Sequence, residues 1–149
     1  MSIIRITKEF KFEMAHALKG YDGPCKNIHG HSYELFVTVT GKPINDGTSS
    51  NNGMVIDFKL LKDIVRENII ENYDHALVLH KESAALIKDD SKELYGKLLA
   101  VNFEPTSENL LIHFASILKN KLPASVKLYS LLLRETVTSF AEWYASDNE

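Results

Sequence analysis

The chain has 149 residues, 44% of them hydrophobic and 25% charged, which predicts one globular domain spanning residues 1–149 and argues against a disordered or fibrous protein. A net charge of −3 gives no electrostatic reason to expect nucleic acid or an anionic membrane surface as a partner, and no apolar stretch approaches the ~20 residues of a membrane span. The N-terminal sequence MSIIRITKEF becomes charged too early for a signal peptide, and one cysteine cannot form an internal disulfide, so we expect a cytoplasmic protein.

Two strands are predicted in the first third of the chain. In residues 10–16, FKFEMAH, charged side chains alternate with a set that shares the other face, namely Phe10, Phe12, Met14 and His16. Residues 29–40 alternate likewise, and one face comprises His29, His31, Tyr33, Leu35, Val37 and Val39. The connecting segment, KGYDGPCKNI, contains glycine and proline and carries Cys25, so we expect a loop there.

A short strand over residues 54–56 and a helix over residues 58–72 are expected next. Asp57 is placed to cap this helix, whose apolar stripe comprises Phe58, Leu61, Ile64, Val65 and Ile69. Residues 81–99 predict a shorter helical segment, although this segment contains Gly96.

A second amphipathic helix and two closing strands complete the expected order. The helix begins near residues 105–108, PTSE, ends at Pro123, and has a core face of Leu111, Phe114, Ala115, Leu118 and Leu122. Strands are expected over residues 126–135 and 139–144. Strands, then helices, then strands predict an α+β sandwich with helices on one face of an antiparallel sheet.

Three histidines fall on matching faces of the first two strands. His29 and His31 are two residues apart, and His16 ends the preceding strand, so a hairpin would gather three imidazoles at its loop end. Three histidines with an open fourth position are typical of a catalytic zinc, and neutral imidazole suits zinc better than magnesium or calcium. The alternative is that these histidines only form hydrogen bonds at a strand edge.

Cys25 precedes His29 in the loop that must arrive beside such a site, and three roles are open to it. As a fourth ligand it would close the site and make the zinc structural. Near the metal but not bound to it, it could act as a thiolate base. It could also be an inert buried thiol, which is the usual role of an isolated cysteine.

Acidic residues offer further candidates at two places. Asp74 and His75 follow the first helix, where they could activate a thiol, although Asp74 could instead fix a surface turn. Glu135 ends an apolar strand and could bind a ligand edge with two N–H donors, or pair with Arg134 or Lys127. Glu108 lies in the first turn of its helix, where the helix dipole explains a carboxylate.

Taken together, these segments resemble the family of 6-pyruvoyltetrahydropterin and 6-carboxytetrahydropterin synthases. The matching segments are FKFEMAH, CKNIHGHSYELFVTVTG, GMVIDFKLLK, YDHALVL, PTSEN and RET, in this order along nearly the whole chain. The resemblance implies a T-fold (tunnelling fold), in which a four-stranded antiparallel sheet is covered on one face by two helices. It also implies assembly into a multimeric barrel, as a homohexamer of two stacked trimers with sites between subunits.

The resemblance also implies a lyase that acts on a pterin triphosphate. His16, His29 and His31 would bind Zn²⁺, which coordinates the side-chain hydroxyls of dihydroneopterin triphosphate. Cys25 would abstract a proton from that side chain, assisted by Asp74 and His75. The last two residues of the implied site are Glu135, which would anchor the pterin and join the proton relay, and Thr106, whose segment lines the pterin pocket.

The spacing of the cysteine favours one branch of the family. Only Lys26, Asn27 and Ile28 separate Cys25 from His29, as in the bacterial queuosine-pathway enzymes. We therefore expect a 6-carboxytetrahydropterin synthase, which also releases acetaldehyde and triphosphate. The alternatives are the pyruvoyl-type elimination, side-chain cleavage of dihydroneopterin, and a non-catalytic domain whose structural zinc is closed by Cys25.

Two departures from the family pattern bear on substrate choice. Tyr73 stands where leucine commonly precedes the Asp-His pair, and this change is conservative. Residues 81–103 are longer than in the most compact members and could reshape a pocket wall.

Overall fold

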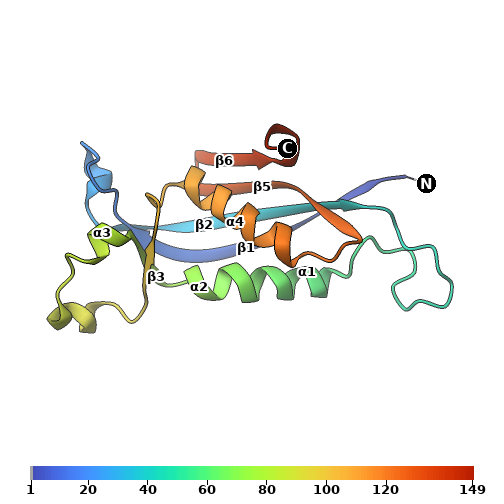
Figure 1. Cartoon of the computed structure of the whole chain (residues 1–149), viewed down its shortest axis with the longest axis horizontal. Helices are drawn as coiled ribbons and strands as arrows, with labels where there is room; N and C mark the ends of the chain where they lie inside the picture. The colour runs from blue at the N-terminus through green and yellow to red at the C-terminus, as the bar shows by residue number, and fades with distance from the viewer. Residues whose placement is uncertain (1) are drawn as a thin grey trace.

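A computed structural model describes residues 2–149, within which the strands form one six-stranded sheet in the order β4-β3-β1-β2-β5-β6. Four of these strands form an antiparallel series, β1 (Ile4–His16), β2 (His29–Gly41), β5 (Val126–Thr136) and β6 (Ser139–Tyr144). The β1–β2 register is unbroken from Ile4↔Gly41 to His16↔His29. This long pair is the axis of the molecule in Figure 1.

The expectation of a four-stranded antiparallel sheet is wrong, because β3 (Ala76–His80) and β4 (Leu98–Val101) extend it beside β1. Strand β3 pairs in parallel with the last residues of β1, from Met14↔Ala76 to His16↔Val78, and β4 pairs in parallel with β3. Residues 76–79 are all buried, so they lack the alternation that reveals a half-exposed strand.

The expected first helix is present as one continuous helical segment. It comprises α1 (Phe58–Val65), the π-helical η2 (Arg66–Ile70) and α2 (Glu71–Tyr73). Asp57 caps it as expected, with its side chain accepting a hydrogen bond from the Lys59 backbone N–H at 2.7 Å. Leu61 and Ile69 are fully buried, whereas Phe58 is 53% exposed, so the apolar stripe begins one turn later than expected.

The second helix, α4 (Ser107–Lys121), lies on the same side of the sheet. The Thr106 side chain caps it by accepting from the Asn109 N–H at 3.3 Å. Its buried residues include Leu111, Phe114 and Leu118, which join the inward-facing residues of β1, β2 and β5 in one core. The expected α+β arrangement, with helices on one face, is therefore confirmed.

Three expected segments differ in detail. Strand β1 begins at Ile4 rather than at residue 10. Residues 54–56 form no strand, since a turn ties Met54 and Gly53 to Ile44 through two backbone hydrogen bonds. The helical segment expected over residues 81–99 is reduced to two short turns, α3 (Lys81–Ala84) and the 3₁₀ turn η3 (Asp89–Leu94), and β4 begins at Leu98.

Two other short 3₁₀ turns are η1 (Pro24–Lys26), in the loop between β1 and β2, and η4 (Ala145–Asp147). The η1 loop and α3 lie at the same end of the molecule, where β1 terminates (Figure 1). Among residues 2–149, none of the helices has the length and apolar character needed to cross a bilayer.

Candidate metal centre

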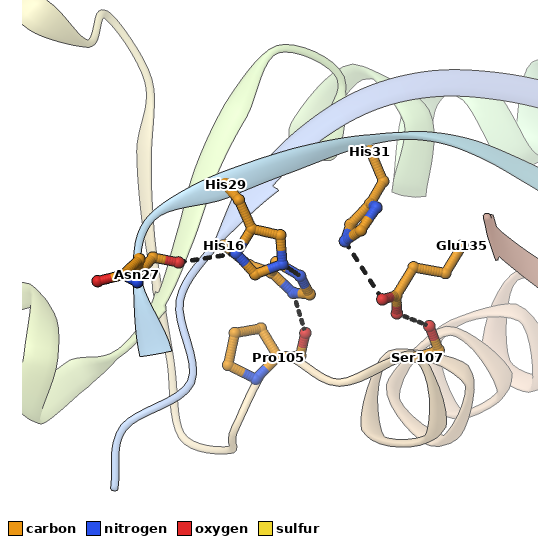
Figure 2. A network of polar contacts seen from close by, with 7 residues as sticks. All are labelled: His16, Asn27, His29, His31, Pro105, Ser107 and Glu135. Atoms are coloured by element: carbon orange, nitrogen blue, oxygen red, sulfur yellow. Dashed lines mark hydrogen bonds and ion pairs between the residues drawn. The ribbon is translucent and has the colours of Figure 1, made fainter. Parts of the chain in front are cut away.

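The three histidines predicted as ligands converge at the end of the β1–β2 pair. His16 is paired with His29, and His31 is paired with Met14, so the register puts all three side chains on the helix-covered face. Their ligand atoms lie within 4.8 Å of one another, and the ring centroids are 4.6–5.2 Å apart. Figure 2 shows the rings turned toward a common space.

Backbone carbonyls fix the orientation of two of these rings. His16 Nδ1 donates to the Pro105 carbonyl oxygen at 2.7 Å, and His29 Nδ1 donates to the Asn27 carbonyl oxygen at the same distance. Because a carbonyl can only accept, the proton of each neutral ring is on Nδ1 and its Nε2 presents a lone pair. The two Nε2 atoms face each other at 3.1 Å, an arrangement that a shared cation would stabilise.

The third ring is also prepared for a ligand role. His31 Nε2 is buried and makes no hydrogen bond among the described residues, although Glu135 Oε1 lies 3.2 Å away. Burial lowers the pKa of His16 and the pKa of His31. The Pro105 carbonyl offsets part of this effect at His16, and the Glu135 carboxylate offsets part of it at His31. A neutral imidazole is the form that binds a metal, so these residues fit a divalent cation with nitrogen preference.

Glu135, at the end of β5, lies beside this cluster. Its Oε2 accepts a hydrogen bond from Ser107 Oγ at 2.5 Å, while Oε1 is the atom close to His31 (Figure 2). Arg134 points to the other face and contacts Glu34 Oε2 at 3.5 Å, so the alternative pairing of Glu135 with its neighbour does not occur. The carboxylate is therefore held in place while remaining partly exposed to a ligand.

Ser107 was not a candidate from the sequence, although it is buried and holds Glu135. Nothing in the residue pattern indicated that the first turn of α4 meets the end of β5. Thr106, one residue earlier, was the expected pocket residue, and its hydroxyl caps α4. Pro105 and Ser107 thus contact His16 and Glu135, while Thr106 between them caps α4.

Cys25 lies in η1, in the loop that precedes the first β2 histidine. It is a half-buried free thiol, and its backbone carbonyl accepts from the Leu18 N–H at 3.0 Å. Within residues 2–149, the mutually close ligand atoms come from the three histidines and do not include the Cys25 sulfur. The three histidines could therefore hold a metal ion without a sulfur ligand.

Asp74 and His75 form a contact that adjacent residues seldom make, with Asp74 Oδ1 3.0 Å from His75 Nδ1. The same oxygen accepts from the Glu13 N–H at 2.9 Å, and His75 adopts a left-handed φ of 58° while its own N–H donates to the Glu13 carbonyl. Although burial by itself would raise it, the pKa of Asp74 is lowered because the Glu13 N–H and His75 stabilise the carboxylate. The same backbone groups of Glu13 thus fix both the turn and the Asp74–His75 contact.

His75 is not part of the three-histidine cluster among the described residues. It lines a cavity of about 1000 Å³ together with Ala15, Gly30 and Ser32, which lie on the sheet face opposite the histidines, and with His31 itself. Much of the remaining wall comes from the long segment after α3, including Leu86, Ile87, Lys88, Leu94 and Tyr95. This segment therefore does shape a cavity wall.

Comparisons with known proteins agree with the fold and the motifs. Residues 5–146 match the family described as 6-pyruvoyl tetrahydropterin synthase. The 6-carboxy-5,6,7,8-tetrahydropterin synthase of Haemophilus influenzae is 38% identical over 143 residues, which cover 95% of this chain and 99% of that protein. The enzyme of the same name from Aquifex aeolicus is 33% identical over 161 residues, which cover 93% of this chain and 96% of that protein.

Solved structures show the same fold at lower identity. An uncharacterized protein from Wolinella succinogenes has a TM-score of 0.77 at 23% identity, covering 97% of this chain and 99% of that one. The 6-pyruvoyl tetrahydropterin synthase of Caenorhabditis elegans has a TM-score of 0.68 at 24% identity, covering 97% of both chains. From the family match and these relatives, we conclude that the chain belongs to the 6-pyruvoyl tetrahydropterin synthase family and is a lyase.

Proposed function

We propose that the chain is a zinc-dependent 6-carboxy-5,6,7,8-tetrahydropterin synthase of queuosine biosynthesis. It converts 7,8-dihydroneopterin triphosphate and water to 6-carboxytetrahydropterin, acetaldehyde and triphosphate. The observation that carries this proposal is the convergence of His16, His29 and His31 in a chain whose full-length relatives bear that enzyme name. The short spacing between Cys25 and His29 supports the same branch.

The donor set favours zinc as the metal. Three neutral imidazole nitrogens suit Zn²⁺, whereas magnesium and calcium favour oxygen ligands. When bound, zinc acidifies the C–H bonds next to a coordinated substrate oxygen. The protein contributes the fixed orientation of two rings through the Pro105 and Asn27 carbonyls, so the ligand atoms need little rearrangement to bind.

We assign the remaining chemistry to residues around the histidines. Cys25 is the base that removes a proton from the substrate side chain. Glu135 anchors the pterin by accepting from its ring N–H and amino group, and Ser107 keeps one carboxylate oxygen in position. Thr106 lies beside them at the N-terminus of α4, where it lines the pterin pocket.

Asp74 and His75 assist Cys25 from a neighbouring subunit in this proposal. Neither residue belongs to the three-histidine cluster of its own chain, and His75 lines a cavity with Gly30 and Ser32 of the opposite sheet face. Within the described residues, β1 hydrogen-bonds to β3 only over Met14–His16, which leaves most of that edge of β1 for another chain. We propose a homohexamer of two stacked trimers, with the sites between subunits.

Product analysis tests the function directly. The zinc-loaded protein is incubated with 7,8-dihydroneopterin triphosphate, and the products are identified by mass spectrometry. We expect 6-carboxytetrahydropterin and acetaldehyde in equal amounts. Accumulation of the pyruvoyl product alone would assign the chain to the elimination reaction of the same family, and turnover of dihydroneopterin by side-chain cleavage would reject both.

A further inference from the structure

The segment before α4 contacts the loop that carries Cys25, through a residue that no part of the proposed chemistry uses. Glu104 Oε2 accepts a hydrogen bond from the Lys19 backbone N–H at 3.0 Å. Lys19 follows β1 closely and lies in the loop that contains η1. We infer that Glu104 is a positioning residue, which holds the Cys25 loop against the turn that fixes His16 and Glu135.

The loop is tied at two successive backbone positions. The Leu18 N–H donates to the Cys25 carbonyl oxygen at 3.0 Å, and the next N–H, that of Lys19, donates to Glu104. The first bond links the start of the loop to Cys25, and the second links that same start to the β4–α4 connection. Glu104 therefore restrains the backbone to which Cys25 is attached.

Glu104 is itself well restrained. Its carbonyl oxygen accepts from the Thr106 N–H at 2.8 Å and from Asn109 Nδ2 at 3.0 Å, and Pro105 limits the backbone that follows. The next residues along the chain contact His16, cap α4 and hold Glu135. Residues 104–107, at the start of α4, thus contact His16, the loop of Cys25 and Glu135.

The Lys19 side chain makes a separate contact, which supplies a matched control. Its ammonium group pairs with Glu82 of α3, and both side chains are about half exposed, so this ion pair contributes little. Lys19→Ala removes the ion pair and keeps the N–H that Glu104 accepts. Glu104→Ala removes the acceptor and keeps the ion pair.

The inference rests on the proposed function only for its effect on turnover, so the experiment also measures the loop itself. Glu104→Ala, Glu104→Gln and Lys19→Ala are prepared as zinc-loaded proteins. Amide hydrogen exchange at Lys19 and the rate of Cys25 alkylation by iodoacetamide are measured first. Zinc content, kcat and KM are then determined with 7,8-dihydroneopterin triphosphate.

We expect Glu104→Ala to exchange the Lys19 amide faster and to alter the alkylation rate, with zinc content unchanged. Its kcat falls about 10–100-fold with little change in KM, because the base is displaced while the pterin anchor remains. In Glu104→Gln the loop properties and kcat return most of the way to wild type, since the amide oxygen accepts the same hydrogen bond. Lys19→Ala behaves as wild type.

Wild-type exchange and alkylation in Glu104→Ala would overturn the inference, as would a Glu104→Gln protein no better than Glu104→Ala. If Glu104→Ala does not fold, Glu104→Asp withdraws the acceptor by one methylene and is expected to show the same loop changes in weaker form. The exchange and alkylation measurements need no substrate. They therefore decide the role of Glu104 even if the reaction proves to be another one.

Discussion

The helix-covered face of the β1–β2 pair has an apolar part and an imidazole part. In the apolar part Phe12 and Tyr33 stack at 5.1 Å, and Phe114 of α4 meets Phe12 edge to face. One register step further, the same face presents His31, and another step presents His16 and His29. The backbone is continuous, so the difference is one of side chains and of what covers them.

The rigidity of the imidazole part comes from the apolar part of the same face. The core packed under the helices fixes the direction of both strands, and the alternation of side chains then sets where the imidazoles point. At the end of the strands the cover changes from apolar helix surface to the polar segment that contains Pro105 and Ser107. Stability is thus expected to depend on the apolar part and function on the imidazole part.

The largest effect is expected from removing a ligand. His29→Ala leaves two imidazoles, which do not hold zinc in competition with water and buffer, so both bound zinc and turnover are lost. Zinc content by atomic emission and turnover of the pterin substrate are measured together. His80→Ala, which removes an imidazole outside the cluster, should keep both, and zinc retained at full occupancy in His29→Ala would contradict the assignment.

Cys25→Ala separates a base from a ligand. We expect zinc to be retained while kcat falls by about 10²–10⁴-fold, the usual effect of losing a positioned general base. Equilibrium dialysis gives zinc affinity, and single-turnover kinetics give the rate of the chemical step. Loss of zinc instead would favour a structural site closed by the thiolate.

A substitution in the apolar part should have the opposite profile. Phe114→Ala removes a fully buried ring from contact with Phe12 and Tyr73 and should lower the free energy of unfolding by about 3–5 kcal/mol. Urea denaturation measures the change. The protein that remains folded should bind zinc normally, and a parallel loss of zinc affinity at low temperature would break the separation between the two parts.

Ser107→Ala tests the contact between α4 and the pterin anchor. Removal of the hydroxyl that donates to Glu135 should raise KM about tenfold, because hydrogen bonds to charged groups contribute roughly 1.5–3 kcal/mol. Zinc content should not change. Ser116→Ala, on the same helix, removes a hydroxyl that donates to the His113 carbonyl, and it should leave KM as in wild type.

The smallest effect is expected on the opposite sheet face. Because the pKa of Asp74 lies below its ordinary value of 3.8 in the folded chain, its charge stabilises the fold above pH 3.8, and this contribution is lost as the pH falls through the lowered value. Asp74→Asn should therefore be less stable than wild type at neutral pH, by less than about 1 kcal/mol for so exposed a group. Urea denaturation between pH 2 and 7 measures the difference, and a gap that widens at low pH would contradict the sign.

Much of the fold was predictable because alternation and helical periodicity are local properties. The inward set of β2, the capped helix after Asp57 and the two closing strands were all visible in the sequence. Strand β3 was not, since a short run that is buried throughout carries no period. Its parallel pairing with β1 also depends on where the chain returns in space, which the local pattern does not contain.

The parts of the site that are set by strand register were predictable from the sequence. The parts that are set by packing between elements were not. The spacing of His29 and His31, with His16 on the facing strand, was sufficient to bring three rings together. The Pro105 carbonyl, Ser107 and Glu104 enter through the way α4 meets the sheet. A carbonyl has no sequence signal, and a serine in a first helical turn is too common to single out.

X-ray absorption spectroscopy of the zinc-loaded protein tests most directly whether the three histidines form an open site. We expect nitrogen and oxygen scatterers at about 2.0–2.1 Å, from three imidazoles and an exchangeable oxygen, with no sulfur. The spectrum should change when the pterin triphosphate is added. A sulfur scatterer at about 2.3 Å that disappears in Cys25→Ala would show a closed structural site and contradict the account.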